Sequence, residues 1–442
     1  MVYETSCSVK YNFGNPPLVG RLPPLKGESA LSLLDLSALL RAPGESDDAL
    51  ARREAARQRL ASHSMPTGRE EVWRYVDLDF ALGDFDLAPP GDGSAPAGDH
   101  QPENTAASAA IADGAVVAAG AHVDGVRCER RVGGDGSLIG ADLDIFTAAH
   151  AAFGAERVEI GVAAGRAVEL PVIVDLGATS GTASFPAVRV DVADGAELTV
   201  AIHLQSANDI AALAVPHIEG RVGANANLTV VVRQEWGRQT RAIGQLGFTV
   251  GRDSTLRLAE AGLGGTLARW QLNIELAGQG SNAQVVGAYF GDRNQTLDYR
   301  YVMHHAAPNT HSTMFLKGAV EDEAGSVFTG MIRIDEAAQR TDAFQTNRNL
   351  ILSEGASSQS VPNLEILAND VKCGHASTVG QLDPEQRYYL MSRGLDRERA
   401  DRLLVRGFFQ EALNRFPIPE LAGPLRERFY QKFLDAQGEG RV

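Results

Sequence analysis

Short segments with one shared pattern recur between residues 194 and 291, and they constrain the fold more than any other feature of the chain. Each has a small polar corner followed by a strand-like alternation of apolar and polar residues. Equivalent leucines stand at Leu198, Leu228 and Leu256, at spacings of 30 and 28 residues. A repeat of this size with no helix inside it predicts β-solenoid coils across about 165–370. On the pattern alone, a β-sandwich of loosely similar hairpins stays open. The segments are DGAELTVAIHL (194–204), GANANLTVVVRQEW (223–236), GRDSTLRLAEAG (251–262) and GSNAQVVGAYFG (280–291).

Segments with helix signals lie on both sides of the repeats and are candidates to cover the unpaired ends of a solenoid. Ser46 opens one helix after a leucine-rich helical stretch that begins near residue 29. Asp383 and Asp396 are predicted N-caps of two helices near the C-terminus, and a third helix follows Pro417. The second of these C-terminal helices is predicted to be amphipathic. Its predicted apolar stripe is Ala400, Leu403, Leu404, Gly407, Phe408 and Ala412.

These patterns divide the chain into four regions. Residues 86–110 contain almost no large apolar side chains and are interpreted as a low-complexity linker, because such a segment cannot build a core. The other regions are an N-terminal arm and helical region (1–85), a β-helix core with its lead-in (111–382) and a C-terminal helical region (383–442).

Charge and cysteine content narrow the classes of function. The net charge of −15 argues against binding to nucleic acid or to an anionic membrane surface. No run of eighteen apolar residues predicts a membrane span, and the first residues lack the apolar core of a secretory signal. Three scattered cysteines do not make a disulfide framework, so a reducing cytoplasm is expected. Cys7 and Cys128 lie outside any motif and are interpreted as incidental.

Cys373 and His375 are the residues most able to carry chemistry. They lie two apart after a β-rich segment, so in a strand both side chains lie on one face, and Gly374 leaves the opposite face unobstructed. A lone Cys-x-His pair is a weak metal signature. A chain with three cysteines and no CxxC pair is not expected to hold an iron–sulfur cluster by itself, since such a cluster normally uses about four thiolate ligands. Ligands from another chain are therefore expected.

Other candidate sites are weaker. His304 and His305 are adjacent and point to opposite faces of a strand, and Pro308 separates them from His311, which disfavours a metal site there. The sequence does not establish that two carboxylates lie together on one face, as a hydrolase would need, among Asp342, Glu354 and Glu365. Neither a phosphate-binding GxxxxGK[ST] motif nor a strand–GxGxxG–helix context is present, so nucleotide hydrolysis by this chain is not expected.

Longer segments resemble the SufB/SufD family, which serves iron–sulfur cluster assembly. The strongest is DVKCGHASTVGQLD followed by YYLMSRGL, in which the Cys-x-His form is similar to the SufD version. Ala376-Ser377-Thr378 departs from the Gly-Ala-Thr that is usual in the family. The resemblance to the family is weakest over about residues 86–190. Further matches are PTGREEVWRYVDL (66–78), HAAPNTHSTMFLKGAVED (305–322) and FTGMIRIDEAAQRTDAFQTNRNLILSEGA (328–356).

The resemblance implies a mainly β protein, a right-handed parallel β-helix flanked by N-terminal and C-terminal helical regions. It implies a non-catalytic, cytoplasmic scaffold that pairs with a SufB-like paralogue and binds the SufC ATPase through residues 383–442. By correspondence, His375 helps to assemble a nascent cluster, or holds iron, at the subunit interface, with Cys373 as an auxiliary thiol. Whether iron, sulfide or electrons from a reduced flavin are the cargo stays open.

Two alternatives to this interpretation are retained. One is a SufB-like or homodimeric cluster scaffold that works without the paralogue. The other is a carbohydrate-active β-helix enzyme, which would need a long groove of carboxylates and aromatic residues. The low aromatic content of 6% disfavours the enzyme.

Overall fold

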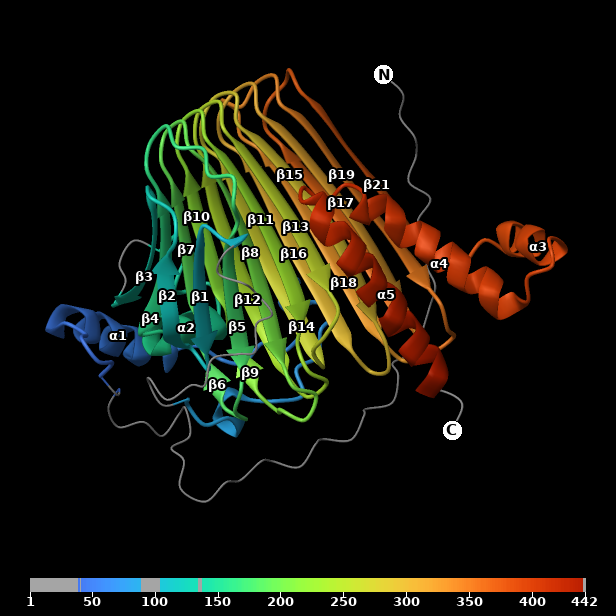
Figure 1. Cartoon of the computed structure of the whole chain (residues 1–442), viewed down its shortest axis with the longest axis horizontal. Helices are drawn as coiled ribbons and strands as arrows, with labels where there is room; N and C mark the ends of the chain where they lie inside the picture. Colours follow the sequence, from blue (N-terminus) through green and yellow to red (C-terminus); the bar gives the residue numbers. More distant parts are fainter. Residues whose placement is uncertain (1–38, 40, 89–103, 134–136, 440–442) are drawn as a thin grey trace.

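The chain folds into two long β-sheets that enclose one interior (Figure 1). A computed structural model describes residues 39, 41–88, 104–133 and 137–439. Within these residues, the ten-stranded sheet has the order β2 (Ala115–Ala121), β1 (Ala107–Ala112), β5 (Val172–Ala178), β8 (Glu197–Ser206), β11 (Asn227–Glu235), β13 (Thr255–Gly262), β15 (Asn282–Gly291), β17 (His311–Val320), β19 (Asp342–Ile351) and β21 (Lys372–Gly380).

The second sheet has eleven strands among the described residues, and its main path starts at the same end as β21. Two very short strands, β6 (Ala183–Ser184) and β9 (Leu213–Ala214), lie beside that path. The order of the path is β20 (Ser357–Ile366), β18 (Gly325–Ile334), β16 (Thr296–His305), β14 (Leu267–Leu276), β12 (Arg241–Val250), β10 (His217–Val222), β7 (Ala187–Val192), β4 (Glu156–Val162) and β3 (Val126–Val132).

The chain passes alternately from one sheet to the other, and neighbours within a sheet are parallel from β4 onward. No helix lies between the consecutive strands of β10 to β21 in this described stretch. The predicted parallel solenoid is therefore confirmed, and a sandwich of antiparallel hairpins or a doubly wound sheet is excluded. The coils extend beyond the predicted 165–370 at both ends, through β1 and β21.

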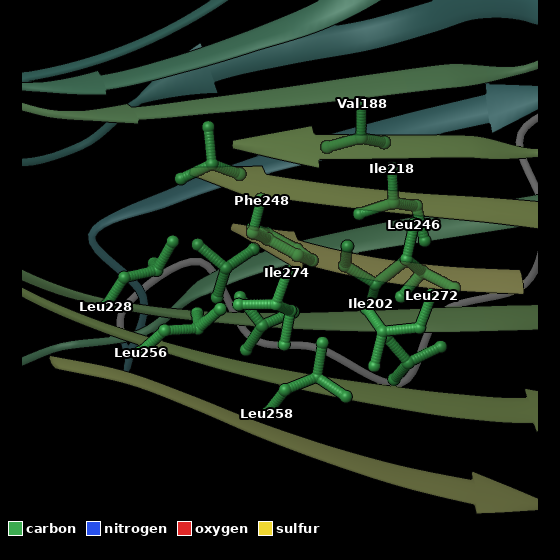
Figure 2. Close-up of a cluster of buried hydrophobic side chains, with 14 of the residues drawn as sticks. Val188, Ile202, Ile218, Leu228, Leu246, Phe248, Leu256, Leu258, Leu272 and Ile274 are labelled. Carbon is green, nitrogen blue, oxygen red and sulfur yellow. The ribbon is translucent and has the colours of Figure 1, made fainter. Parts of the chain in front are cut away.

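The repeated leucines and the polar corners explain why these segments form coils. Leu198, Leu228 and Leu256 pair in register on β8, β11 and β13, and all three are buried in the interior. Figure 2 shows two of these leucines packed among side chains from both sheets. The polar corner that opens each of the four repeated segments contains a residue with a left-handed backbone. These residues are Gly195, Asn225, Asp253 and Gly280, types that adopt this conformation with little strain.

The N-terminal region packs on the outer face of the second sheet. It contains α1 (Asp47–Leu60), η1 (Glu71–Trp73) and η2 (Leu82–Asp84), and α2 (Ile145–Phe153), which follows β3 in the chain, packs beside α1. Trp73 is buried beneath the Arg269 guanidinium, which lies 3.9 Å from the ring centroid. Arg300 donates to the Arg74 carbonyl oxygen at 2.6 Å. The side chains of Arg269 and Arg300 both pair with buried Asp298. This cluster fixes residues 71–74 to β14 and β16.

Three helices follow β21: α3 (Pro384–Ser392), α4 (Arg397–Leu413) and α5 (Pro419–Glu439). The predicted N-caps are confirmed, since the side chains of Ser46, Asp383 and Asp396 accept bonds from the first turns of α1, α3 and α4. Helices α4 and α5 cover β15 and β17 (Figure 1). Lys317 of β17 pairs with Glu411 of α4 and donates to the Phe408 carbonyl oxygen at 3.0 Å.

Two predictions about these regions were wrong in detail. The linker does not extend to 110, because β1 begins at Ala107. The alanine-rich sequence of β1 gives little local signal for a strand, and β1 forms by pairing with β2 and β5. The apolar stripe of α4 is also rotated. The buried residues of α4 are Ala400, Val405, Phe409, Ala412 and Leu413, whereas Leu403 is 47% exposed. The leucine-rich stretch near 29–38 and Cys7 lie outside the described residues.

Candidate functional site

The last coil of the solenoid, formed by β20 and β21, differs from every coil before it. Each of its strands is the outermost strand of its sheet, so each leaves one backbone edge unpaired by the described chain. Neither strand has a single buried residue. At the opposite end, by contrast, β2 and β3 turn back antiparallel on β1 and β4 and lie against each other. Strands β2 and β3 are also the outermost strands of their sheets, but both contain buried residues, whereas β20 and β21 contain none. We call the end formed by β20 and β21 the open end and the end formed by β2 and β3 the closed end.

The open end carries both predicted site residues. Cys373 and His375 lie on β21 with the same parity, as predicted, and Cys373 packs against the edge of the interior cluster. His375 is exposed at the end of the coil. The outer face is not unobstructed at Gly374, however: an added Cβ there would lie 2.9 Å from the Phe344 ring. That ring covers the strand from outside, so the reactive pair faces the interior side.

The thiol of Cys373 is a weak acid in this setting. Burial and the charge of Asp342 raise the pKa of Cys373 to about 11, so at neutral pH it is a thiol. Lys372 lies on the other face of the strand and does not lower it. A bound metal ion must displace the thiol proton before the sulfur becomes a ligand. His375 requires no such step when its imidazole is neutral, which makes it the more available ligand of the two.

The side chains beneath the pair are polar. Strands β19 and β21 pair in parallel, so that His375 of β21 lies beside Gln345 of β19, and Ser377 lies beside Asn347. Ser377 also donates to Ser360 of β20 at 2.7 Å, so one hydrogen bond joins the two sheets across the open end. The sequence interpretation missed Gln345 and Asn347. The available signal was their inward parity directly after the apolar residues Met314 and Leu316 of the preceding coil.

The remaining candidates do not converge on one site. His304 pairs with Asp335 at 2.8 Å, while buried His305 is bonded to the hydroxyls of Thr310 and Ser312. The two rings point to opposite faces, as predicted. No group of three or more His, Cys, Asp or Glu able to hold a metal ion occurs among the residues that the model describes. Cys128 is buried on β3, at the opposite end of the solenoid from β21.

Helix α3 offers a second exposed surface. None of its residues is buried, and it projects from the body of the solenoid beyond α4 (Figure 1). Tyr388, Tyr389 and Met391 are 75%, 56% and 42% exposed, and Leu403 of α4 adds a fourth exposed apolar side chain. Large apolar side chains gathered on one small helix are typical of a protein interaction site.

Comparison with known proteins identifies the family. The model of the SufBD core domain of the SUF iron–sulfur cluster assembly system matches residues 175–408, more than half of the chain. The chain belongs to the SufBD family. An iron–sulfur cluster assembly SufBD family protein of Mycobacterium leprae is 31% identical over 368 residues, covering 81% of this chain and 88% of that protein.

Two SufD proteins are similar to the chain over shorter lengths. Escherichia coli SufD is 31% identical over 223 residues, which cover 50% of this chain and 53% of that protein. Bacillus subtilis SufD is 32% identical over 278 residues, 62% and 63% of the two chains. Because the chain belongs to this family, we no longer retain the alternative of a carbohydrate-active β-helix enzyme. In the described part of the SufBD chain, no helix is long and apolar enough to cross a membrane.

Proposed function

We propose that this SufBD protein is a SufD-like scaffold subunit that receives iron and sulfide at the open end of its solenoid. It acts in the cytoplasm, binds its cargo without catalysing a reaction of its own, and pairs there with a SufB-like paralogue. Pairing with a second copy, as in a SufB-like or homodimeric scaffold, is the alternative, and it would use the same surface.

The open end is the observation that carries this proposal. Strands β20 and β21 contain ten and nine residues, and both leave an edge of backbone donors and acceptors without a partner strand in the described chain. Such edges pair readily with strands of another chain. Exposed Ile366, Leu367 and Val379 add apolar area around these edges. A second solenoid end would cover these groups and enclose His375 and Cys373.

The chemistry of the pair suits a shared nascent cluster. A neutral imidazole and a thiolate are both ligands for iron, and a cluster normally takes about four ligands. This chain supplies two at the open end, so the partner must supply the rest. His375 is the principal ligand, and Cys373 is the auxiliary one because its thiol must first lose a proton. We assign none of the described residues to a reduced flavin.

The C-terminal helices are the docking region for a SufC-like ATPase. Helices α4 and α5 are anchored to the solenoid by a buried apolar cluster and by ion pairs, of which Lys432–Asp292 is 2.7 Å long. They therefore form a rigid base. The exposed tyrosines of α3 and the exposed Leu403 of α4 form the contact surface on that base.

Hydrogen exchange on the chain alone and in a co-expressed complex with SufB-like and SufC-like chains tests the proposed pairing. Amides of β20 and β21 should exchange rapidly in the isolated chain and be strongly protected in the complex. Amides of the closed end, in β3 and β4, serve as the internal control and should not change. Equal exchange of β20 and β21 in both samples would show that the open end is not the interface.

A further inference from the structure

The outer edges of β20 and β21 differ in the backbone groups that they present. In a parallel ladder the N–H and C=O groups of one residue point to the same neighbouring strand, and those of the next residue point the other way. The Lys372 N–H group donates to the Thr341 carbonyl oxygen at 2.9 Å, so the even-numbered residues of β21 face β19. The odd-numbered residues face the outer edge. They are Cys373, His375, Ser377 and Val379.

On β20 the even-numbered residues face the outer edge. The Ser357 N–H group donates to the Ala324 carbonyl oxygen at 3.0 Å, and the Leu367 N–H group donates to the Ile334 carbonyl oxygen at 2.9 Å. The register with β18 does not shift between these two bonds, so the odd-numbered residues face β18 throughout. The edge-facing residues are therefore Ser358, Ser360, Pro362, Leu364 and Ile366.

Pro362 interrupts the outer edge of β20 at its centre. A proline has no N–H group to donate, and its ring stands where a neighbouring strand would approach. Prolines and charged side chains protect sheet edges from strand addition, and β20 carries both, since Glu365 is exposed. Residues 373–380 of β21 include no proline, lysine, arginine, aspartate or glutamate. Only the edge of β21 is therefore unbroken, with a donor and an acceptor at every edge-facing residue.

A strand that pairs with this edge bonds to the site residues themselves. The backbone groups of Cys373 and His375 face the edge, while their side chains have the inward parity of β21. Adjacent strands lie about 5 Å apart, and residues that lie side by side on them point their side chains to the same face. An added strand thus places alternate side chains beside Cys373 and His375, where a shared cluster needs its further ligands.

We propose that the SufB-like partner adds one strand to the edge of β21 and contacts β20 through side chains alone. This inference rests on the proposed function, because it assigns strand pairing at the open end to one of the two edges. A second copy of this chain is a poorer occupant of the edge. It would bring another net charge of −15 to the same complex, and like charges of this size oppose self-association.

Ser360 and Ser377 are matched positions for the test, because both face the outer edge and their hydroxyl groups share one hydrogen bond. Proline at either position removes one edge-facing N–H group, whereas alanine loses the same hydroxyl and keeps that group. Binding of each full-length variant to the SufB-like chain is measured by analytical ultracentrifugation. Ser377→Pro should bind about ten- to hundredfold more weakly than Ser377→Ala, since it leaves a partner carbonyl unpaired. Ser360→Pro should stay within about twofold of Ser360→Ala.

The other outcomes each contradict one part of the inference. Equal affinities of Ser377→Pro and Ser377→Ala would show that no strand is added to β21. An equal loss in Ser360→Pro would show that both edges take a strand. Self-association of the wild-type chain that Ser377→Pro abolishes, with no binding of the SufB-like chain, would make a second copy the occupant. A wild-type chain that binds neither would overturn the proposed pairing itself, and this inference with it.

Hydrogen exchange at single-residue resolution in the wild-type complex makes the test independent of how the proline variants fold. On binding of the SufB-like chain, the amides of Ser377 and Val379 should gain at least about tenfold more protection than those of Ser360 and Leu364. The reason is that only the first pair donates to an added strand. Equal protection of the two pairs would overturn the assignment of the strand to β21.

Discussion

Glu260→Gln is expected to change the stability of the protein increasingly in favour of the variant as the pH rises. Glu260 points into the interior from β13, is 2% exposed and has one carboxyl oxygen bonded to the Tyr301 hydroxyl. Burial raises the pKa of Glu260 from 4.5 to about 8. No cation contacts the carboxyl among the described residues, and the ionisable groups that face it are Tyr299 and Tyr301. The folded state therefore keeps a proton that the unfolded chain releases.

The sign and size follow from that difference. Between about pH 4.5 and pH 8 the folded chain binds one more proton than the unfolded chain, so the free energy of unfolding falls as the pH rises. The slope is about 1.4 kcal/mol per pH unit, which amounts to about 3 kcal/mol at pH 7. The amide that replaces the carboxyl has no proton to release, so this loss disappears in the variant. The unpaired amide N–H groups of the variant lower its free energy of unfolding by about 1–3 kcal/mol at every pH.

Urea unfolding followed by tryptophan fluorescence measures this effect at pH 5, 6, 7 and 8. The difference in unfolding free energy between variant and wild type should widen in favour of the variant by about 1.4 kcal/mol per pH unit. Glu275→Gln, at an exposed position on β14, is the control and should show no such trend. A difference that stays constant across this range would refute the reasoning, because Glu260 would then be ionised in the folded protein.

Three other substitutions test separate parts of the structure. Gly318→Ala should destabilise the chain by about 1–3 kcal/mol or more in urea unfolding, because the new Cβ would lie 2.0 Å from a buried tyrosine ring; wild-type stability would show that the ring is not there. Trp73→Ala should cost about 3–5 kcal/mol by the same assay and expose residues 71–74 to proteolysis; a cost below about 1 kcal/mol would mean that the Arg269 cluster does not hold this segment. Tyr388→Ser with Tyr389→Ser should leave stability within about 0.5 kcal/mol, since both side chains are exposed, yet reduce capture of the SufC-like ATPase in a pull-down; undiminished capture would place the docking surface elsewhere.

The parts of the fold set by local pattern could be predicted from the sequence. The leucine spacing at Leu198, Leu228 and Leu256 predicted coils because one strand per sheet must return to the same register in each turn. N-caps such as Asp383 and Asp396 were also predictable, since a cap needs only a side-chain oxygen and the first-turn amides. The shared face of Cys373 and His375 followed from the two-residue period of a strand.

What could not be predicted depends on contacts between distant segments. The strand at Ala107 is formed by pairing with β5, more than sixty residues later, and its alanines give no local signal. The buried face of α4 is set by β15 and β17, which select Val405 and Phe409 rather than the leucines beside them. The open end itself required the full strand order, because only the topology shows that β20 and β21 lack outer neighbours.

Iron and acid-labile sulfide in the purified complex test the central claim most directly. Wild-type chain and His375→Ala are co-expressed anaerobically with SufB-like and SufC-like partners, and complexes of equal subunit stoichiometry are compared. The account predicts that His375→Ala assembles normally but carries sharply less iron and sulfide, with a smaller reduction in Cys373→Ala. Wild-type amounts of iron and sulfide in the His375→Ala complex would contradict the claim that the open end of the solenoid receives the cluster through this histidine.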